Sequence, residues 1–287
     1  NVPSLRGAIL PYSDDAWVST HVDALDAQFG SKPFAVGALP QRKGKSGVYV
    51  VAYGDPAREC ATRLLKSLRK HMKGLPVAVV SDKPLPGADI FIEHPDSDIG
   101  ARGVKTQIYD LAPAEWDYVL YLDADTEVVG DISFLFDLLV DGWQLAFCYN
   151  PAKYVLAAQM RRKDNDDECA LTFEAIGTDQ LLQYNGGVFC FRRCKETERL
   201  FHDWHTEWDR WGARDQAALD RALYAQPLRI YTLGLDWNCV TRYETPTENT
   251  AVCHYPMTAR RWKGRINGRL DSGEAWGAVH PPRGTKP

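Results

Sequence analysis

Residues Val119 to Thr126 read Val-Leu-Tyr-Leu-Asp-Ala-Asp-Thr, and they place two carboxylates directly after an apolar run. A short, continuous apolar run is typical of a strand that is buried on both faces of its sheet. Because residues i and i+2 of a strand share a face, Asp123 and Asp125 are predicted to point the same way. Two aligned carboxylates at the carboxyl edge of a parallel sheet are suited to a divalent cation. The alternative is a pair of solvated or helix-capping acids.

Apolar runs and amphipathic stretches alternate along the chain around this motif. Strands are predicted at 48–53, 76–81, 90–92, 118–122, 144–149 and 188–191. Helices are predicted at 56–72, 106–111, 132–140, 195–209 and 214–224. Asp55 is expected to cap the first helix and Pro56 to open it. The alternation predicts an α/β fold with a mostly parallel sheet flanked by helices.

The length and charge of the chain bound its organisation. A chain of 287 residues with 45% hydrophobic and 25% charged residues is suited to one large α/β domain. We expect an N-terminal arm and linker over 1–46, the main domain over 47–262 and a C-terminal tail over 263–287. The formal net charge is -4 and no stripe of Lys and Arg occurs, so nucleic acid is not an expected partner. No apolar run approaches the roughly 18 residues that a membrane helix needs, so no membrane span is expected.

The cysteines do not suggest a disulfide framework, because there are seven of them in a large chain. No Asn-x-Ser/Thr sequon is present. Both features favour a reducing compartment and therefore a cytoplasmic location. The alternative is a chain whose signal or anchor preceded Asn1 and was removed.

Further polar residues follow the same order as the predicted elements. Lys105 precedes the Asp pair and is suited to offsetting the charge of a diphosphate, although a surface lysine is the alternative. At Asn185-Gly186-Gly187, glycines permit close approach of a ligand and Asn can donate to and accept from sugar hydroxyls, whereas the alternative is a turn before a strand. Asp215-Gln216 pairs a carboxylate with an amide, which suits hydroxyl binding or merely a helix first turn.

A basic segment with one histidine lies near the end of the chain. His254 ends an apolar run and is a candidate third metal ligand; a set of oxygens and one imidazole suits Mn²⁺ better than Ca²⁺. Arg260, Arg261 and Lys263 are candidates for holding phosphate oxygens. A core or surface histidine is the alternative for His254.

The motifs taken together resemble a known family. They are Lys105, Tyr121-Leu-Asp-Ala-Asp-Thr126, Asn185-Gly-Gly-Val188, Asp215-Gln216 and His254-Tyr255. In this order and spacing they resemble the retaining glycosyltransferases of family 8, which include glycogenin and bacterial galactosyltransferases. The resemblance extends from Val48 to Trp262. It implies a GT-A fold with an acceptor-side region after it, Mn²⁺ or Mg²⁺ at the Asp-x-Asp motif, and a UDP-sugar donor, with glucose or galactose favoured.

The resemblance also implies roles for individual residues. It assigns the metal to Asp123, Asp125 and His254 and the transferred sugar to Asn185, Asp215 and Gln216. It assigns contacts with the donor nucleotide to Ala52, Tyr53, Lys105, Ala124, Gly186, Arg261 and Lys263. Three positions depart from the family pattern: Ala52 replaces a threonine, Gly186 replaces a small polar residue, and 256–262 lacks the usual Gly and Lys-Pro-Trp.

A mechanism follows from the resemblance and from charge. Loss of diphosphate builds negative charge on the leaving oxygen, which a divalent ion stabilises. No carboxylate nucleophile stands at a matching position, so retention is expected through front-face attack, with the leaving phosphate oxygen accepting the proton of the acceptor. Residues 151–184 and the tail from Lys263 are expected to shape the pocket of the hydroxyl acceptor.

Two other functions fit the Asp pair. In a haloacid-dehalogenase-like phosphatase, Asp123 is the phosphoryl nucleophile and Asp125 the general acid, with Asp166-Asp167 as the late acidic pair. Three predicted strands precede the motif here, whereas that class carries it on its first strand. A sugar-nucleotide binder without catalysis is the third reading, and turnover of donor in the presence of an acceptor distinguishes it.

Overall fold

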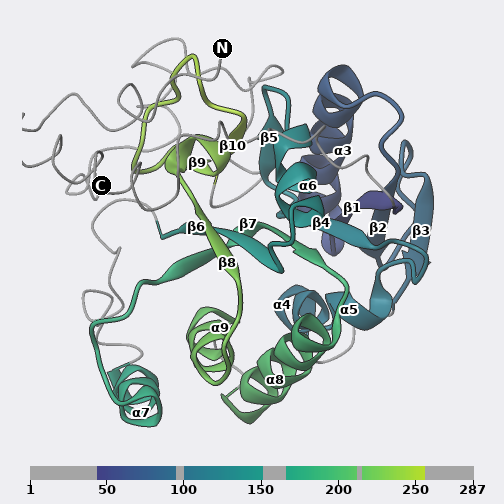
Figure 1. The fold of residues 1–287 in the computed structure, drawn as a ribbon. Helices are drawn as coiled ribbons and strands as arrows, with labels where there is room; N and C mark the ends of the chain where they lie inside the picture. The colour runs from purple at the N-terminus through teal and green to yellow at the C-terminus, as the bar shows by residue number, and fades with distance from the viewer. Residues whose placement is uncertain (1–43, 95–99, 151–165, 212–214, 256–287) are drawn as a thin grey trace, which may run out of the picture. The chain divides into compact units, whose positions relative to one another are not determined.

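A seven-stranded sheet lies at the centre of the protein (Figure 1), with the strand order β3-β2-β1-β4-β7-β6-β8. The computed structural model describes residues 44–94, 100–150, 166–211 and 215–255. Residues 1–43 of the predicted arm, the predicted tail, Arg260 and Arg261 lie outside the described residues, and the domain boundaries therefore stay predictions. The strands are β1 (Ser46–Val51), β2 (Val77–Ser81), β3 (Ile90–Glu93), β4 (Tyr118–Leu122), β6 (Leu145–Tyr149), β7 (Tyr184–Arg192) and β8 (Ile230–Leu233).

The direction of the strands confirms the predicted mostly parallel sheet. Strands β3, β2, β1 and β4 are parallel neighbours, and β6 is parallel to β8. Only β7, between β4 and β6, runs antiparallel to both of its neighbours. The carboxyl ends of β1 and β4 therefore meet at one edge of the sheet, directly before the Asp pair.

A second, three-stranded sheet has the order β5-β10-β9 and consists of β5 (Thr126–Val128), β9 (Cys239–Val240) and β10 (Val252–His254). Strand β10 is antiparallel to β5, with His254 opposite Thr126. It is parallel to β9, with His254 opposite Val240. This small sheet brings the end of the described chain back beside the segment that follows β4.

Helices cover both faces of the large sheet (Figure 1). They are α3 (Gly54–His71), α4 (Gly100–Thr106), α5 (Ile108–Leu111), α6 (Ser133–Val140), α7 (Asp166–Ile176), α8 (Lys195–Trp211) and α9 (Asp215–Tyr224), with the short 3-10 helix η2 (Leu235–Trp237). Helices α3 and α6 lie on one side of the sheet, and α4, α5, α8 and α9 lie on the other.

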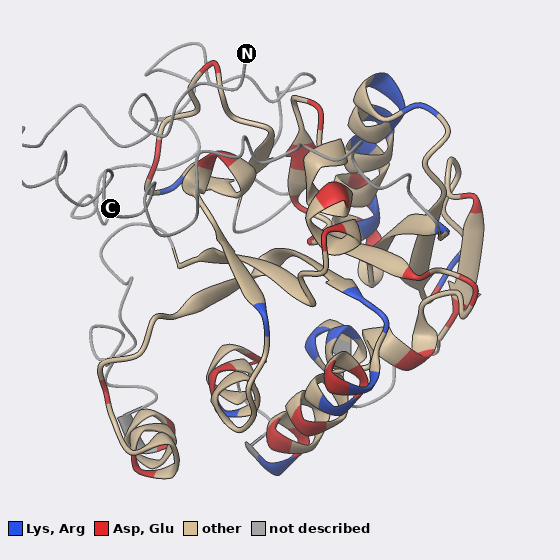
Figure 2. Cartoon of the chain, viewed as in Figure 1, with Lys and Arg blue, Asp and Glu red and all other residues tan. Residues whose placement is uncertain are grey.

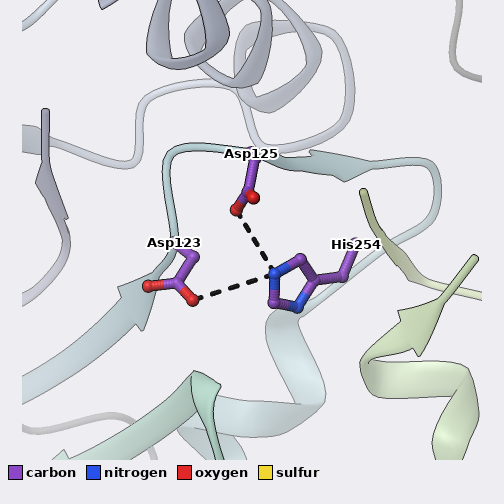
Figure 3. A group of neighbouring side chains, drawn as sticks. All are labelled: Asp123, Asp125 and His254. Carbon is purple, nitrogen blue, oxygen red and sulfur yellow. Dashed lines mark ion pairs between the residues drawn. The ribbon is translucent and has the colours of Figure 1, made fainter. Parts of the chain in front are cut away.

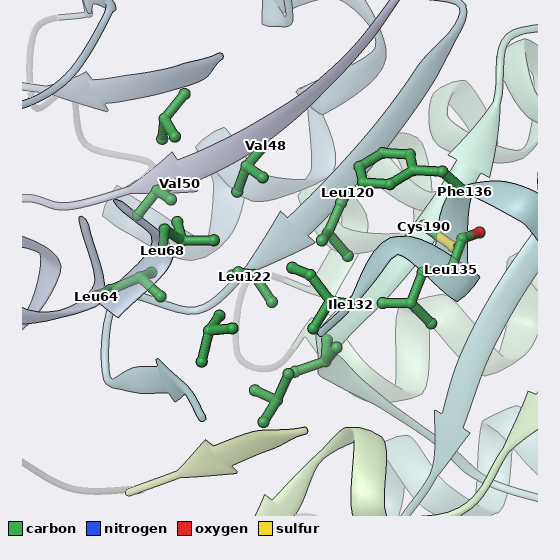
Figure 4. Close-up of a cluster of buried hydrophobic side chains, with 14 of the residues drawn as sticks. Val48, Val50, Leu64, Leu68, Leu120, Leu122, Ile132, Leu135, Phe136 and Cys190 are labelled. Atoms are coloured by element: carbon green, nitrogen blue, oxygen red, sulfur yellow. The ribbon is translucent and has the colours of Figure 1, made fainter. Parts of the chain in front are cut away.

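Alternation along each strand divides the core into two clusters. Val48 and Leu120 face the α3 and α6 side, where they pack with Leu64 and Phe136 (Figure 4). Their strand neighbours face the other cluster, which contains Tyr49, Val119, Tyr121, Phe189 and Trp204. Because both faces are buried, the strands read as continuous apolar runs, and this is why the sequence pattern located them. Each fully buried aliphatic side chain stabilises the fold by about 1.5–3 kcal/mol.

The start of the first helix differs from the sequence prediction. Helix α3 begins at Gly54, so the expected capping role of Asp55 is wrong. The carboxylate of Asp82 instead accepts the N–H of Gly54 at 3.3 Å, while Asp55 lies in the first turn and pairs with Arg58. The acceptor is supplied from the end of β2, which local sequence does not reveal.

Two further boundaries differ. The predicted helix 106–111 is two helices, α4 and α5, and Lys105 lies in the last turn of α4. The predicted strand at 188–191 begins earlier, at Tyr184, so Asn185-Gly186-Gly187 lies inside β7 and not in a turn before it. Cysteine usage agrees with expectation, since all seven cysteines are free thiols and Cys194 alone among them is not fully buried.

Charged residues of both signs alternate along α8, whereas α4 carries only the basic Arg102 and Lys105 (Figure 2). Within the described part of the chain, no helix combines the length and the apolar character needed to cross a membrane.

A buried polar chain connects α9 to the sheet. The Gln183 side chain donates to Asp220 at 2.9 Å and accepts from Asn150 at 2.8 Å. Asp220 is 1% exposed, and burial raises the pKa of its carboxyl group to about 8, although the hydrogen bond from Gln183 and the charge of Arg221 oppose the shift. Helix α9 is therefore held by a carboxyl group that is largely protonated at neutral pH.

Replacing Asp220 by Asn is expected to make the free energy of unfolding depend less on pH. The folded-state pKa of Asp220 lies above the value of about 4 in an unfolded chain. The contribution of this carboxyl group to the free energy of unfolding is therefore complete below about pH 4 and is lost as pH rises through about pH 8. Urea unfolding of Asp220→Asn should show a smaller loss between about pH 5 and about pH 8 than the wild type. Exposed Asp110→Asn is the control. A wild-type slope retained in Asp220→Asn would contradict this account.

Candidate metal and substrate site

The Asp pair lies in a turn and not on the strand itself. Strand β4 ends at Leu122, and the N–H and hydroxyl of Thr126 donate to the carbonyl of Asp123 at 3.0 and 2.8 Å. The N–H of Asp123 donates to the carbonyl of Gly187 on β7 at 2.8 Å. The premise that both acids share a strand face is therefore wrong. The turn nevertheless brings both carboxylates to the same side of the sheet edge.

His254 completes the cluster from the small sheet (Figure 3). Its Nε2 lies 3.3 Å from Asp125 Oδ1 and 3.8 Å from Asp123 Oδ2. One ligand atom from each of the three residues lies within 4.8 Å of the others. The histidine is buried, and burial opposes its charge, but the carboxylates of Asp125 and Asp123 raise its pKa.

The donor set fits a divalent cation. Two carboxylates and one imidazole nitrogen converge, and the His254 Nδ1 lies 2.9 Å from Asn238 Oδ1, which leaves Nε2 toward the carboxylates. Mixed oxygen and imidazole ligands suit Mn²⁺. The three predicted metal residues therefore come together, although His254 follows the Asp pair by more than a hundred positions in the chain.

Lys105 is buried beside these acids, so it is not a surface lysine. Its Nζ lies 3.2 Å from Asp123 Oδ1, 3.3 Å from Asp215 Oδ2 and 4.8 Å from the centre of the Tyr121 ring. Burial disfavours the charged amine, but the two carboxylates outweigh it and raise the pKa of Lys105. The Tyr121 hydroxyl donates to the same Asp123 oxygen at 2.6 Å. Lys105 therefore connects α4, the end of β4 and the start of α9.

A cavity of about 430 Å³ collects most of the predicted site residues. Its wall contains Lys105, Asp123, Asp125, Asn185, Gly186, Asp215, Gln216 and His254. It also contains Tyr121 and Gly187, which belong to the motifs, and three residues that the sequence did not indicate: Val51, Ala101 and Arg102. Three predicted residues, Ala52, Tyr53 and Ala124, do not belong to the wall that the described residues form. Ala52 is fully buried in the core, and Tyr53 and Ala124 are partly buried and pack against core residues.

The first residues of α9 are held in place by their neighbours. The indole N–H of Trp204 donates to the Asp215 carbonyl at 2.8 Å, and the Gln216 amide donates to the Tyr184 carbonyl. Because the Gln216 side chain is anchored on β7, its position relative to Asn185 is set by the sheet. The Asp215 carboxylate faces Lys105.

The glycines of β7 leave room for the side chains of His254 and Lys105. The β6–β7 register shifts between Phe147 and Cys148, whose partners are Phe189 and Asn185, and this irregularity lies at the site. A Cβ added at Gly187 would lie 2.5 Å from His254 Cε1 and 2.8 Å from its Nδ1. A Cβ at Gly186 would lie 3.4 Å from Lys105 Nζ. Gly187 is therefore required by the close packing of His254.

Asn238 is the main residue that sequence analysis missed. It is 1% exposed and contacts both His254 and Asn185. It lies directly after η2, in a stretch without a recognisable pattern. Its partners lie 16 and 53 positions away, so no spacing rule could have indicated it.

Comparison with known proteins identifies the fold. The WbbM bifunctional glycosyltransferase in its apo structure is similar with a TM-score of 0.56 and 14% identity, over 76% of this chain and 47% of WbbM, so the chain spans about half of that protein. The galactosyltransferase LgtC, in complex with donor and acceptor sugar analogs, is similar with a TM-score of 0.56 and 18% identity, over 81% of this chain and 92% of LgtC. No protein-family model and no curated protein sequence matches the chain. The protein has the GT-A fold of these glycosyltransferases, as the sequence predicted.

The Gly187→Ala substitution is expected to destabilise the protein through His254. Because the new methyl group overlaps the imidazole ring, the cost should be about 1–3 kcal/mol. In a His254→Ala background the cost should fall markedly, since the ring is gone, with only the Asn185 contact remaining. Urea unfolding of the four proteins measures this coupling, and equal costs in both backgrounds would show that the ring is not the obstacle.

Proposed function

We propose that the protein is a metal-dependent retaining glycosyltransferase of the family 8 type. It transfers a hexose from a UDP-sugar, with glucose or galactose favoured, to a hydroxyl acceptor. The observation that carries the proposal is the Asp123, Asp125 and His254 cluster in the wall of one cavity at the carboxyl edge of a GT-A sheet. Ligands of open α/β sheets bind at this edge.

The three residues of the cluster would hold Mn²⁺ or Mg²⁺. When bound, such an ion stabilises the negative charge that develops on the leaving diphosphate. Lys105 supplies a second positive charge on the same side of the cavity, and its neighbours keep it protonated. A cation held by the cluster, together with Lys105, would therefore place positive charge where a diphosphate leaves.

Asp215 bears on the stereochemistry. It is the one carboxylate of the described cavity wall besides the metal pair, and it is engaged with Lys105 at 3.3 Å. Both of its oxygens face cations, because Arg102 Nε lies 4.0 Å from Oδ1 and Lys105 Nζ lies 3.3 Å from Oδ2. A carboxylate engaged in this way is not free to accept the proton of an acceptor hydroxyl, which disfavours an inverting mechanism that needs a general base. Front-face attack, with the leaving phosphate oxygen accepting the acceptor proton, is the proposed step. Asp215 positions the sugar and stabilises positive charge at its anomeric carbon, and Asn185 and Gln216 border the same space.

The competing functions have weaker support. A phosphatase needs an Asp123 carboxylate that is free to attack, but one oxygen accepts from Tyr121 and Lys105 and the other faces His254. Asp166-Asp167, the late acidic pair of that reading, opens α7, and no apolar run directly precedes it in the sequence. A binder without turnover shares the metal and nucleotide site, so kinetics alone separates it from an enzyme.

The acceptor is proposed to enter beside residues 151–184 and the tail from Lys263. In the similar LgtC structure, donor and acceptor sugar analogs are bound together. A sugar or another hydroxyl compound is accordingly the proposed acceptor class.

Donor binding should depend on the metal and on Asp125. UDP-glucose or UDP-galactose should raise the Tm of the wild type only when Mn²⁺ is present, because Asp123, Asp125 and His254 would hold the ion and its charge would attract the diphosphate. At about 100-fold excess over Kd the gain corresponds to about 2.7 kcal/mol. Asp125→Ala should abolish the shift, whereas exposed Asp141→Asn should retain it. Stabilisation by guanosine or cytidine sugars but not uridine sugars would overturn the donor assignment.

The first-formed product should retain the α configuration of an α-linked donor, as proton NMR can determine. Asp215→Asn should lower turnover by about 10²-fold, the scale of a positioning defect, while UDP-sugar binding stays within a few-fold of wild type. Gln180→Glu, an exposed change after α7, is the control. A β-linked product would exclude both the retaining mechanism and the family assignment.

A further inference from the structure

The Asn238 side chain joins the metal cluster to the sugar side of the cavity. Its Oδ1 lies 2.9 Å from His254 Nδ1, and its Nδ2 donates to Asn185 Oδ1 at 2.9 Å. The same Asn185 oxygen accepts the N–H of Gly187 at 2.8 Å. Three side chains and one backbone group thus form a continuous hydrogen-bonded chain inside the protein.

The direction of every bond in this chain follows from its last member. A backbone N–H can only donate, so the Asn185 atom that faces Gly187 is the carbonyl oxygen. That oxygen can only accept, so Asn238 must present its NH₂ group to it. The Asn238 oxygen then faces His254, and Nδ1 of the imidazole must carry a proton.

We propose that Asn238 is a positioning residue that fixes His254 as the tautomer with the proton on Nδ1 and a bare Nε2 toward Asp123 and Asp125. The inference rests on the proposed function, because it gives the bare nitrogen a metal to bind. Histidine ligands of metals commonly donate their second N–H to a fixed acceptor, which orients the ring and raises the basicity of the ligating nitrogen. Here the acceptor is a buried amide whose own orientation is set by the Gly187 N–H.

The same chain determines what Asn185 offers to a substrate. Its oxygen already accepts from both Gly187 and Asn238, so its NH₂ is the remaining polar group. Asn185 borders the cavity. It therefore recognises an oxygen acceptor on the transferred sugar, such as the lone pair of a hydroxyl group, and not a hydroxyl proton.

The proposed positioning role of Asn238 can be distinguished from a purely structural role. Its backbone N–H donates to the Leu235 carbonyl at 3.0 Å and is unaffected by side-chain substitution. The position of His254 in β10 is held by backbone bonds with β5 and β9. Loss of the amide should therefore disturb the imidazole more than the fold.

The affinity for Mn²⁺ alone, measured by electron paramagnetic resonance, tests the proposal. Asn238→Leu, of similar size, should weaken Mn²⁺ binding by about 10- to 100-fold. Asn185→Asp should bind Mn²⁺ at least as tightly as the wild type, since a carboxylate accepts both bonds, whereas Asn185→Leu should weaken it. Circular dichroism and the metal-free Tm verify folding. Wild-type Mn²⁺ affinity in folded Asn238→Leu would overturn the proposal.

A second measurement depends neither on metal binding nor on substitution of Asn238. Long-range proton–nitrogen NMR of the metal-free wild type, at alkaline pH where the imidazole is neutral, should show the His254 proton on Nδ1. His254→Gln assigns the signal. A proton on Nε2 would overturn the relay. If the wild type binds no Mn²⁺, the proposed metal dependence fails, while the tautomer still decides the role of Asn238.

Discussion

The arrangement of the site depends on the ion pairs that the buried ammonium group of Lys105 makes with two carboxylates. This group lies between Asp123 at the end of β4 and Asp215 at the start of α9, and it is carried by α4. A buried charge is tolerated only when it is paired, and breaking such a pair by removing one partner typically costs about 3–5 kcal/mol. The ion pairs therefore connect three elements: α4, the end of β4 and the start of α9. They also concentrate opposite charges around one cavity, at the edge where a GT-A sheet binds its ligands.

The second constraint is close packing around His254. The small sheet delivers the imidazole to the Asp pair, but the ring fits only because Gly187 lacks a side chain. The irregular register of β7 also turns Asn185 and the carbonyl of Gly187 toward the site, where the carbonyl accepts the N–H of Asp123. One strand segment thus positions an acid, leaves room for an imidazole and orders the hydrogen bonds behind it. A side chain at position 187 would fill the space that the imidazole occupies.

The similarity to WbbM and LgtC concerns the fold, and the low identity leaves the chemistry to the residues of this chain. Those residues form a coherent set. Two acids and an imidazole converge, a buried lysine stays charged, and an amide chain orients the imidazole. A glycosyl transfer that expels a diphosphate requires positive charge at the leaving group, which Lys105 and a cation held by the cluster would supply, and this requirement links the geometry to the function proposed for it.

The sequence alone determined the α/β class, most strand positions and most residues of the described cavity wall, because buried strands and polar motifs are local patterns that survive without tertiary information. It did not determine how those residues act. Asp123 and Asp125 converge through a turn closed by Thr126, α3 begins where Asp82 supplies an acceptor, and Lys105 is buried by two acids. No sequence pattern indicated Asn238. Each of these features is a contact between segments distant in the chain, and only the packed structure brings such groups within hydrogen-bonding distance.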